Sequence, residues 1–395
     1  MHNGKLIKIL KTFDSDEFRR FNRYLRAPFI NTNEHLIKLY KYLKKYYPDF
    51  DSPNLKKEKI FAKLFPGLPF NKDKYAALIK RMIRLSEDYL LWLENEENTL
   101  VRKKKLLKVY ANRNLFGLYA KGHRQMLESL EKRPFRDLEY FRDRIELHSD
   151  YYFHPLNDKY DLEDDSLPHL MEDIDKYFVL SKLSFGNEMK SRERILKKKY
   201  DIRFLDNLMK ESELFSDNVA VRLNFLILKL LDEPGPEIFE EIETLFFSNI
   251  QNLRLNDKQR VYFYGLNYVN RQVNVGKTEY SKKALEWYKF GLKDNLLAQN
   301  GKISEISFGN IVVFGCREQE FDWTDAFIRD YEDKMRAKNK ADVIQYNKGL
   351  VDFYRGNFES AFSILNNHKF GYSFQLKARL TALRVIFELF LTDHT

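Results

Sequence analysis

The sequence predicts an all-α protein in which a small N-terminal helical bundle precedes an array of helical hairpins. Only 10 prolines and 15 glycines occur in 395 residues, which favours helix over irregular structure. Apolar residues recur every three or four positions through much of the chain, as on the buried stripe of a helix. Because 395 residues exceed the usual size of one compact core, we expect either two or three domains or an extended array.

Residues 1–95 are predicted to form the basic N-terminal bundle. Asp14 or Ser15 can cap the first helix, because a short polar side chain there accepts a hydrogen bond from the first helical turn. Prolines and polar residues separate this helix from the three that follow. The predicted helices cover residues 17–27, 34–47, 56–65 and 71–93. Polar residues 94–98 are the expected end of the bundle.

Residues 96–215 are predicted to form a region of long helices joined by short connections. The expected helices cover residues 101–112, 115–130, 138–153, 170–185 and 188–211. The clearest interruption is residues 155–168, which begin and end with proline and contain five acidic side chains. We expect this segment to be an exposed acidic loop.

Residues 216–395 are predicted to form regular helical hairpins. The paired helices are 219–231 with 236–247, 258–274 with 278–293, and 303–316 with 322–336. Pro236 occupies a favourable first-turn position. Ala284, Ala326 and Ala361 lie 42 and 35 residues apart, which indicates a period near 34 residues with one longer loop.

The stretch Tyr346–His368 contains one complete helix-turn-helix unit. Gly349 allows a second helix to approach, Gly356 supplies a turn with positive φ, and Ala361 suits a close contact between two helices. This spacing resembles the tetratricopeptide repeat (TPR), with a partial motif match within residues 219–391. The resemblance implies a right-handed α-solenoid of TPR-like hairpins, which bury their apolar faces by stacking on one another.

The final predicted helix, residues 374–391, is apolar almost all round. A solenoid normally ends with a helix whose outer face is polar. We therefore expect another chain to cover this helix, giving self-association, or the natural protein to continue further.

The charge of +10 is unevenly distributed. Residues 1–134 contain 30 of the 68 Lys and Arg and 15 of the 58 Asp and Glu, so this third carries +15 and the remainder −5. Basic side chains on helix faces can follow a nucleic-acid backbone. The candidate phosphate contacts are Arg19, Arg23, Arg26, Lys38, Lys41, Lys45, Lys103, Lys104 and Lys105. The alternatives are an ordinary solvated face, an acidic protein or a membrane surface.

The sequence contains no HExxH or CxxC motif. Cys316 is the only cysteine and lies in an apolar run, which favours a buried structural thiol and a reducing, cytoplasmic location. His148, Asp150, His154 and Asp158 form the only local group of metal-capable side chains, without the spacing of one helical face. We expect no cofactor, no metal, no secretory signal and no membrane span, because no apolar run approaches about 20 residues.

Stacked hairpins can line a concave groove. The candidate partner-binding residues are Tyr264, Asn267, Tyr268, Asn270 and Arg271, which combine aromatic and amide groups on one helix. By the resemblance, we expect a non-catalytic scaffold that binds a protein or peptide in this groove. The alternative is a nucleic-acid-associated regulatory protein that contacts phosphates through its basic N-terminal third. A hydrolase assembled from distant helices stays open at this point.

Overall fold

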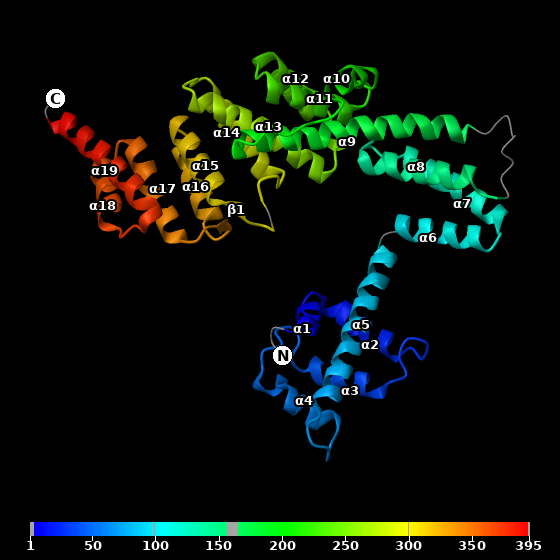
Figure 1. Cartoon of the computed structure of the whole chain (residues 1–395). Coiled ribbons are helices and arrows are strands. Elements are labelled where there is room, and N and C mark those ends of the chain that lie inside the picture. Colours follow the sequence, from blue (N-terminus) through cyan, green and yellow to red (C-terminus); the bar gives the residue numbers. More distant parts are fainter. Residues whose placement is uncertain (1–3, 98, 156–164, 299, 394–395) are drawn as a thin grey trace. The chain divides into compact units, whose positions relative to one another are not determined.

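The computed structural model describes residues 4–97, 99–155, 165–298 and 300–393, and these are overwhelmingly helical (Figure 1). Nineteen α-helices and one pair of two-residue strands occur in these ranges, which confirms the all-α class. The chain divides into two compact units, residues 1–126 and residues 127–395. The finer division into 1–95, 96–215 and 216–395 stays a prediction.

Unit 1 contains the predicted N-terminal helices. Its elements are α1 (Lys5–Leu10), α2 (Ser15–Arg26), α3 (Glu34–Lys44), the 3-10 turn η1 (Pro53–Leu55), α4 (Lys57–Leu64), α5 (Lys72–Glu97), α6 (Thr99–Asn112) and the first part of α7 (Phe116–Glu131). α2 begins at the expected cap. The Asp14 carboxylate accepts hydrogen bonds from the backbone N–H groups of Asp16 and Glu17 at 2.8 Å, while the Glu17 side chain accepts one from Asp14 N–H.

An aromatic-rich core holds the helices of residues 5–97 together. Phe13, Phe21 and Tyr89 are buried and their rings lie in mutual contact at centroid distances of 5.1–5.5 Å. The Tyr89 hydroxyl donates to the Glu17 carbonyl at 2.9 Å, and the Tyr40 hydroxyl donates to the Phe18 carbonyl at 2.8 Å. Large aromatic groups therefore supply buried area here, while their hydroxyls tie α3 and α5 to α2.

Unit 2 consists of the end of α7 and the helices that follow it. The elements are α8 (Leu138–Tyr152), α9 (Ser166–Leu196), α10 (Leu205–Leu214), α11 (Val219–Asp232), α12 (Pro236–Ser248), η2 (Ile250–Asn252), α13 (Leu255–Asn274), α14 (Tyr280–Lys293), β1 (Ile303–Ser304), α15 (Glu305–Arg317), α16 (Phe321–Tyr331), β2 (Met335–Arg336), α17 (Lys340–Arg355), α18 (Phe358–Asn367) and α19 (Tyr372–Asp393). β1 and β2 form a short parallel pair. Consecutive helices from α11 to α18 pack in pairs.

α9 corrects two of the predicted helices. The sequence predicts separate helices over residues 170–185 and 188–211, but one 31-residue helix covers Ser166–Leu196 and a non-helical segment follows it. Gly186 and Asn187 do not end the helix because both are buried against neighbouring elements. The Asn187 side-chain amide donates to the Asn224 carbonyl of α11 at 2.9 Å. Packing against α11 thus overrides a local sequence signal for a break.

Most of the predicted acidic loop, residues 156–164, lies outside the described residues. The second proline of that segment, Pro168, lies in the first turn of α9, so the predicted loop extends too far. Proline is well tolerated in a first turn because the N–H groups there have no intrahelical partner.

Glycines determine how closely paired helices approach in unit 2. A Cβ at Gly265 of α13 would overlap the Trp287 ring of α14, and one at Gly349 of α17 would lie 2.9 Å from Leu365 of α18. Gly356 ends α17 with φ of +84° in the left-handed region, and Ala361 is fully buried. The structural roles predicted for Gly349, Gly356 and Ala361 are therefore confirmed.

Two further expectations concern single features of the fold. Cys316 is buried, and burial raises the pKa of its thiol to about 12, so the thiol stays protonated near neutral pH. No helix in the described part of the chain is long and apolar enough to cross a bilayer.

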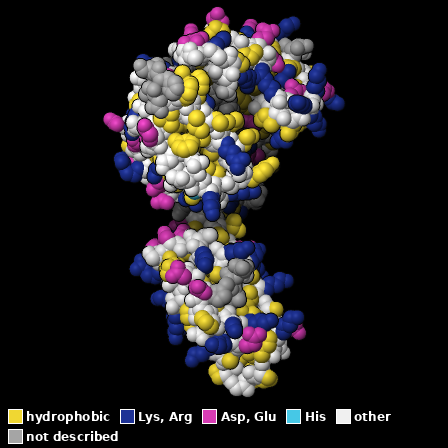
Figure 2. All heavy atoms as spheres, turned by 90° about the vertical axis from the view of Figure 1, so that its left-hand side faces the viewer, with side chains coloured by type: hydrophobic (Ala, Val, Ile, Leu, Met, Phe, Trp, Pro, Cys, Tyr) yellow, Lys and Arg dark blue, Asp and Glu magenta, His cyan; other side chains and the backbone are white. Residues whose placement is uncertain are grey.

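α19 packs one face on its neighbours and leaves another apolar face uncovered. Ala378 and Val385 are buried against α18, whereas Leu380, Leu383 and Phe387 are more than half exposed. Figure 2 shows hydrophobic side chains gathered on the side of unit 2 where α19 lies in Figure 1. The exposed apolar surface expected at this helix is present.

The contact between Gly265 and Trp287 gives a prediction for stability. Gly265→Ala should lower the unfolding free energy by about 2 kcal/mol, because a methyl group at this position overlaps a buried indole ring. Chemical unfolding followed by tryptophan fluorescence measures the change. Gly309→Ala is the matched control: Gly309 lies in α15 with open space where its Cβ would stand, so we expect no loss and a gain of up to about 1 kcal/mol. Equal destabilisation by both variants contradicts the assigned role of Gly265.

Candidate functional site

A cavity of about 360 Å³ lies between α9, α11 and α13 of unit 2. These helices pack together, with α11 in contact with both others. α9 contributes Ser191, Arg194 and Ile195; α11 contributes Ile227, Leu230 and Leu231; and α13 contributes Tyr264, Asn267, Tyr268, Asn270, Arg271 and Asn274. The lining therefore combines aliphatic groups on α11 with polar and charged groups on α9 and α13.

All five candidate partner-binding residues line this cavity. Tyr264, Asn267, Tyr268 and Arg271 follow one another at spacings of three, one and three residues, which places them on neighbouring positions of one side of α13. Asn270 extends the same side toward the end of the helix. Their role in binding stays a prediction.

The two tyrosines differ in how much of each faces the cavity. Tyr268 is only 3% exposed and its ring stacks on Phe239 at 4.6 Å, so most of this side chain belongs to the core. Tyr264 is half-buried, and its hydroxyl donates to Glu188 Oε1 at 2.9 Å. Burial, together with the negative charge of Glu188, raises the pKa of Tyr264. Tyr264 is therefore a neutral aromatic wall whose hydroxyl is already engaged.

Asn270 connects the cavity to a buried polar network. Its side-chain amide donates to the Tyr288 hydroxyl at 3.1 Å, and the amide of Asn310 donates to the same hydroxyl at 2.9 Å. Tyr288 is buried, and burial raises its pKa despite these two bonds. The Asn270 carbonyl oxygen is buried and makes no hydrogen bond within the described residues. Asn270 is thus positioned mainly by α14 and α15.

Asn267, Asn274 and Arg271 are the exposed polar members of α13 in the cavity. Opposite them, α9 supplies Arg194, which sequence reasoning did not select. The sequence around residue 194 does not indicate a binding site, because tertiary packing is what brings this side chain near α13. In the described part of the chain, neither Arg194 nor Arg271 forms a hydrogen bond or ion pair.

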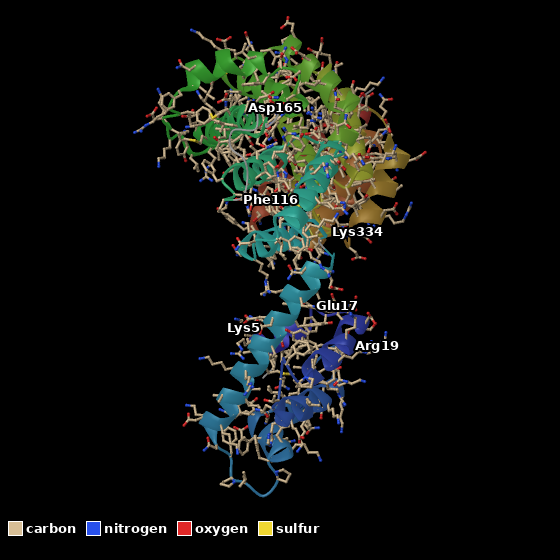
Figure 3. The ribbon with its side chains drawn as sticks, turned by 90° about the vertical axis from the view of Figure 1, so that its right-hand side faces the viewer. Lys5, Glu17, Arg19, Phe116, Asp165 and Lys334 are labelled. Atoms are coloured by element: carbon tan, nitrogen blue, oxygen red, sulfur yellow. The ribbon has the colours of Figure 1, made fainter. Side chains whose placement is uncertain are left out.

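The candidate phosphate-contacting residues all lie in unit 1. The exposed ones are Arg19, Arg23 and Arg26 of α2, Lys38 and Lys41 of α3, Lys45 just after it, and Lys103 and Lys105 of α6, whereas Lys104 is half-buried. Arg19 lies on the outer side of α2 and pairs with Asp16 (Figure 3). Lys105 Nζ donates to Asn95 Oδ1 at 2.7 Å. Figure 2 shows basic side chains spread over the visible face of this unit, with acidic and apolar ones between them.

The local group around His148 offers no described metal site. His148 and His154 are buried, whereas Asp158 lies outside the described residues. Within the ranges that the structure describes, no three His, Cys, Asp or Glu side chains are grouped to hold a metal ion.

Two buried carboxyls in unit 2 have altered acidity with structural causes. Burial raises the pKa of Asp137, which caps α8 through the Tyr140 N–H at 2.9 Å and pairs with Arg254 at 2.7 Å. Burial likewise raises the pKa of Asp173, whose Oδ2 accepts from Arg144 Nε at 2.8 Å. Both carboxylates hold α8 to neighbouring elements, and these contacts account for their burial.

Comparison with known proteins gives no relative from which a role could be transferred. No protein-family model, no curated protein and no solved structure matches this chain.

Proposed function

We propose that this chain is a non-catalytic scaffold that binds a protein or peptide in the cavity between α9, α11 and α13. The observation that carries the proposal is that all five candidate residues of α13 line one open cavity of about 360 Å³. A cavity of this size accepts one or two amino-acid side chains, and its mixture of aliphatic, amide and guanidinium groups is suited to a peptide. The proposal extends this pocket to a groove along a right-handed α-solenoid of TPR-like hairpins.

Contacts between successive hairpins support the repeat array. The helices α11 and α12, α13 and α14, α15 and α16, and α17 and α18 pack together in pairs. First helices also contact one another, as α11 with α13, α15 with α17 and α17 with α19. In helical repeats such first helices form the inner, concave wall. α13, which bears the candidate residues, is one of these first helices.

The proposal makes the chain a binding protein and places it in the cytoplasm. The buried carboxyls Asp137 and Asp173 form ion pairs with arginines, and Cys316 is buried in α15. We therefore assign these three side chains a structural role and not a catalytic one. The single buried thiol is also suited to a reducing compartment.

Blocking the cavity gives a test of the binding site. A phage-displayed library of random 12-residue peptides, selected on the full chain, should yield peptides that lose about tenfold or more affinity for Asn267→Trp. The reason is that an indole at position 267 fills the space between α13 and α9. Fluorescence anisotropy of the labelled peptides measures the change.

Asn256→Trp is the matched control for this test. Asn256 is also exposed on α13 but lies outside the cavity, so its replacement should leave peptide affinity unchanged. The proposed groove is contradicted if the selected peptides bind the wild type and Asn267→Trp equally well, or if the library yields no binding peptide.

A second candidate function is nucleic-acid binding through unit 1. The specific observation is that Arg23, Lys38 and Lys41 are exposed and make no ion pair within the described part of the chain. Such cations can release counterions from a phosphate backbone on binding. Their interspersion with other side chains in Figure 2 favours the alternative of a solvated face.

Salt dependence separates these alternatives. If unit 1 binds phosphates, the full chain should bind a labelled random duplex, and affinity should fall by about a decade or more between low and moderate salt. The triple variant Arg23→Gln, Lys38→Gln, Lys41→Gln should weaken binding. The variant Lys277→Gln, Lys282→Gln, Lys302→Gln removes the same charge from unit 2 and should not. Equal effects of both variants, or no binding, exclude a unit 1 phosphate site.

We also propose that a second copy of the chain covers the exposed face of α19. An apolar groove runs along Leu380, Leu383 and Phe387 and is bordered by charges of both signs, Lys377 with Arg384 and Glu388. A twofold pairing brings opposite charges together while it buries the apolar side chains.

The mass of the protein in solution tests this self-association. Sedimentation equilibrium should show mass rising with concentration toward a dimer, and Phe387→Glu should abolish the rise by placing a charge in the apolar contact. Ile306→Glu is the control, because Ile306 is 76% exposed and belongs to a different helix, α15. A monomer at every concentration, or an equal effect of the control, refutes the pairing.

A further inference from the structure

Two guanidinium groups share the cavity between α9, α11 and α13. Arg194 reaches it from α9 and Arg271 from α13, and neither has a hydrogen-bond acceptor or ion-pair partner in the part of the chain that the structure describes. A guanidinium offers five N–H donors in a planar fork. Most other arginines of unit 2 that lie near these helices are paired, as Arg222 is with Glu241 and Arg260 with Asp257.

The contacts along α9 and α13 change character at this cavity. Arg260 of α13 donates to Ser184 of α9, and one turn later the Tyr264 hydroxyl donates to Glu188. Two turns further along both helices, past Asn267 and Ser191, Arg271 and Arg194 line the cavity as a third pair. The first two pairs are complementary, whereas the third brings together two cations. The polar side chains of α9 and α13 therefore pair with one another up to the cavity, and the two guanidinium groups in the cavity have no such pairing.

The positive charge of Arg271 also acts on Arg194. The pKa of Arg194 is lowered, first by loss of hydration and then by the positive charge of Arg271, and Asp232 opposes these effects. Asp232 is shared with Lys190, to which it lies at 2.9 Å. One carboxylate shared in this way leaves an excess of positive charge among Lys190, Arg194 and Arg271.

Helix ends account for part of this arrangement. Arg194 lies in the last turn of α9 and Arg271 in the last turn of α13, where the partial negative charge of free carbonyls stabilises cations. This effect explains why arginine is tolerated at both positions. It does not supply the in-plane acceptors that either guanidinium fork would bind.

Positive charge continues beyond the cavity along the chain. After Arg194, the segment that follows α9 exposes Lys197, Lys198 and Lys199. These lysines directly follow the last turn of α9, and a concentration of positive charge attracts anions and raises their rate of association.

The geometry points to a carboxylate-binding site in which Arg194 and Arg271 together hold the carboxylate of a peptide. This inference rests on the proposed peptide groove and names the group that anchors the ligand there. The carboxylate comes from the end of a chain or from an acidic side chain. Aliphatic residues Ile195, Ile227 and Leu230 line the same cavity, so the carboxylate is expected beside an apolar group. This combination is a better match for a peptide than for inorganic phosphate.

Small probes with and without a carboxylate test the site on the full chain. Saturation-transfer NMR should show binding of N-acetyl-leucine, which represents a chain end, or of N-acetylglutamic acid α-amide, which represents an acidic side chain. The neutral N-acetyl-leucine amide should bind about tenfold more weakly than the better acid. Arg194→Gln and Arg271→Gln should each weaken binding of that acid by about tenfold or more, because each removes one charged fork.

Arg192→Gln is the matched control for the arginine variants. Arg192 is exposed on the same helix, two residues from Arg194, and does not line the cavity, so its replacement should leave acid binding unchanged. Circular dichroism verifies that each variant keeps its helix content. If the tighter-binding acid loses as much affinity for Arg192→Gln as for Arg194→Gln, its binding depends on general surface charge. That result would contradict the proposed carboxylate site.

The remaining outcomes separate this inference from the proposed groove. If the acid and the neutral amide bind equally well and both are lost in Asn267→Trp, the groove stands and the carboxylate site is wrong. If inorganic phosphate binds more tightly than either acid, the carboxylate assignment is wrong. If no probe binds, the carboxylate site is likewise wrong, and the groove is judged by the peptide selection alone. The acid that binds more tightly identifies the source of the carboxylate.

Discussion

The close approach of paired helices in unit 2 is the constraint on which its other features depend. In α13 and α14, Gly265 faces the Trp287 ring and Gly291 faces the Tyr262 hydroxyl end, so each helix receives a large side chain of the other. The Tyr262 hydroxyl donates to the Trp287 carbonyl at 3.0 Å, and Trp287 Nε1 donates to Glu243 Oε1 at 2.9 Å. Because a ring fills the space above each glycine, the hairpin has little freedom to slide or separate.

That constraint divides α13 into two functional sides. One side of α13, with Gly265 and Tyr262, packs against α14. Another side, with Asn267 and Arg271, lines the cavity. The periodicity of the helix keeps these sides apart over its 20 residues. Substitutions on the open side can therefore change the surface of the cavity without loosening the hairpin, as the proposed binding site requires.

Local sequence signals predicted much of the helical framework. The cap at Asp14 and the turn at Gly356 depend on residues within a few positions, and the close contact at Gly349 depends on Leu365 of the next helix; each occurs as expected. The predicted helices failed where distant packing prevailed. α9 continues through Gly186 and Asn187, and Asn187 bonds to Asn224 of α11, a partner 37 residues away that no local window contains.

The candidate site was predictable only on one of its three walls. The side of α13 can be found from the spacing of its aromatic and amide residues, but Arg194 joins it only because α9 stays helical past residue 187. A helix of 31 residues is about 46 Å long. Had it ended near Gly186, the last turn with Arg194 would not run beside α13, and Arg271 would have no like charge to face. The same buried contact that misled the local prediction of α9 therefore brings the second guanidinium to the cavity.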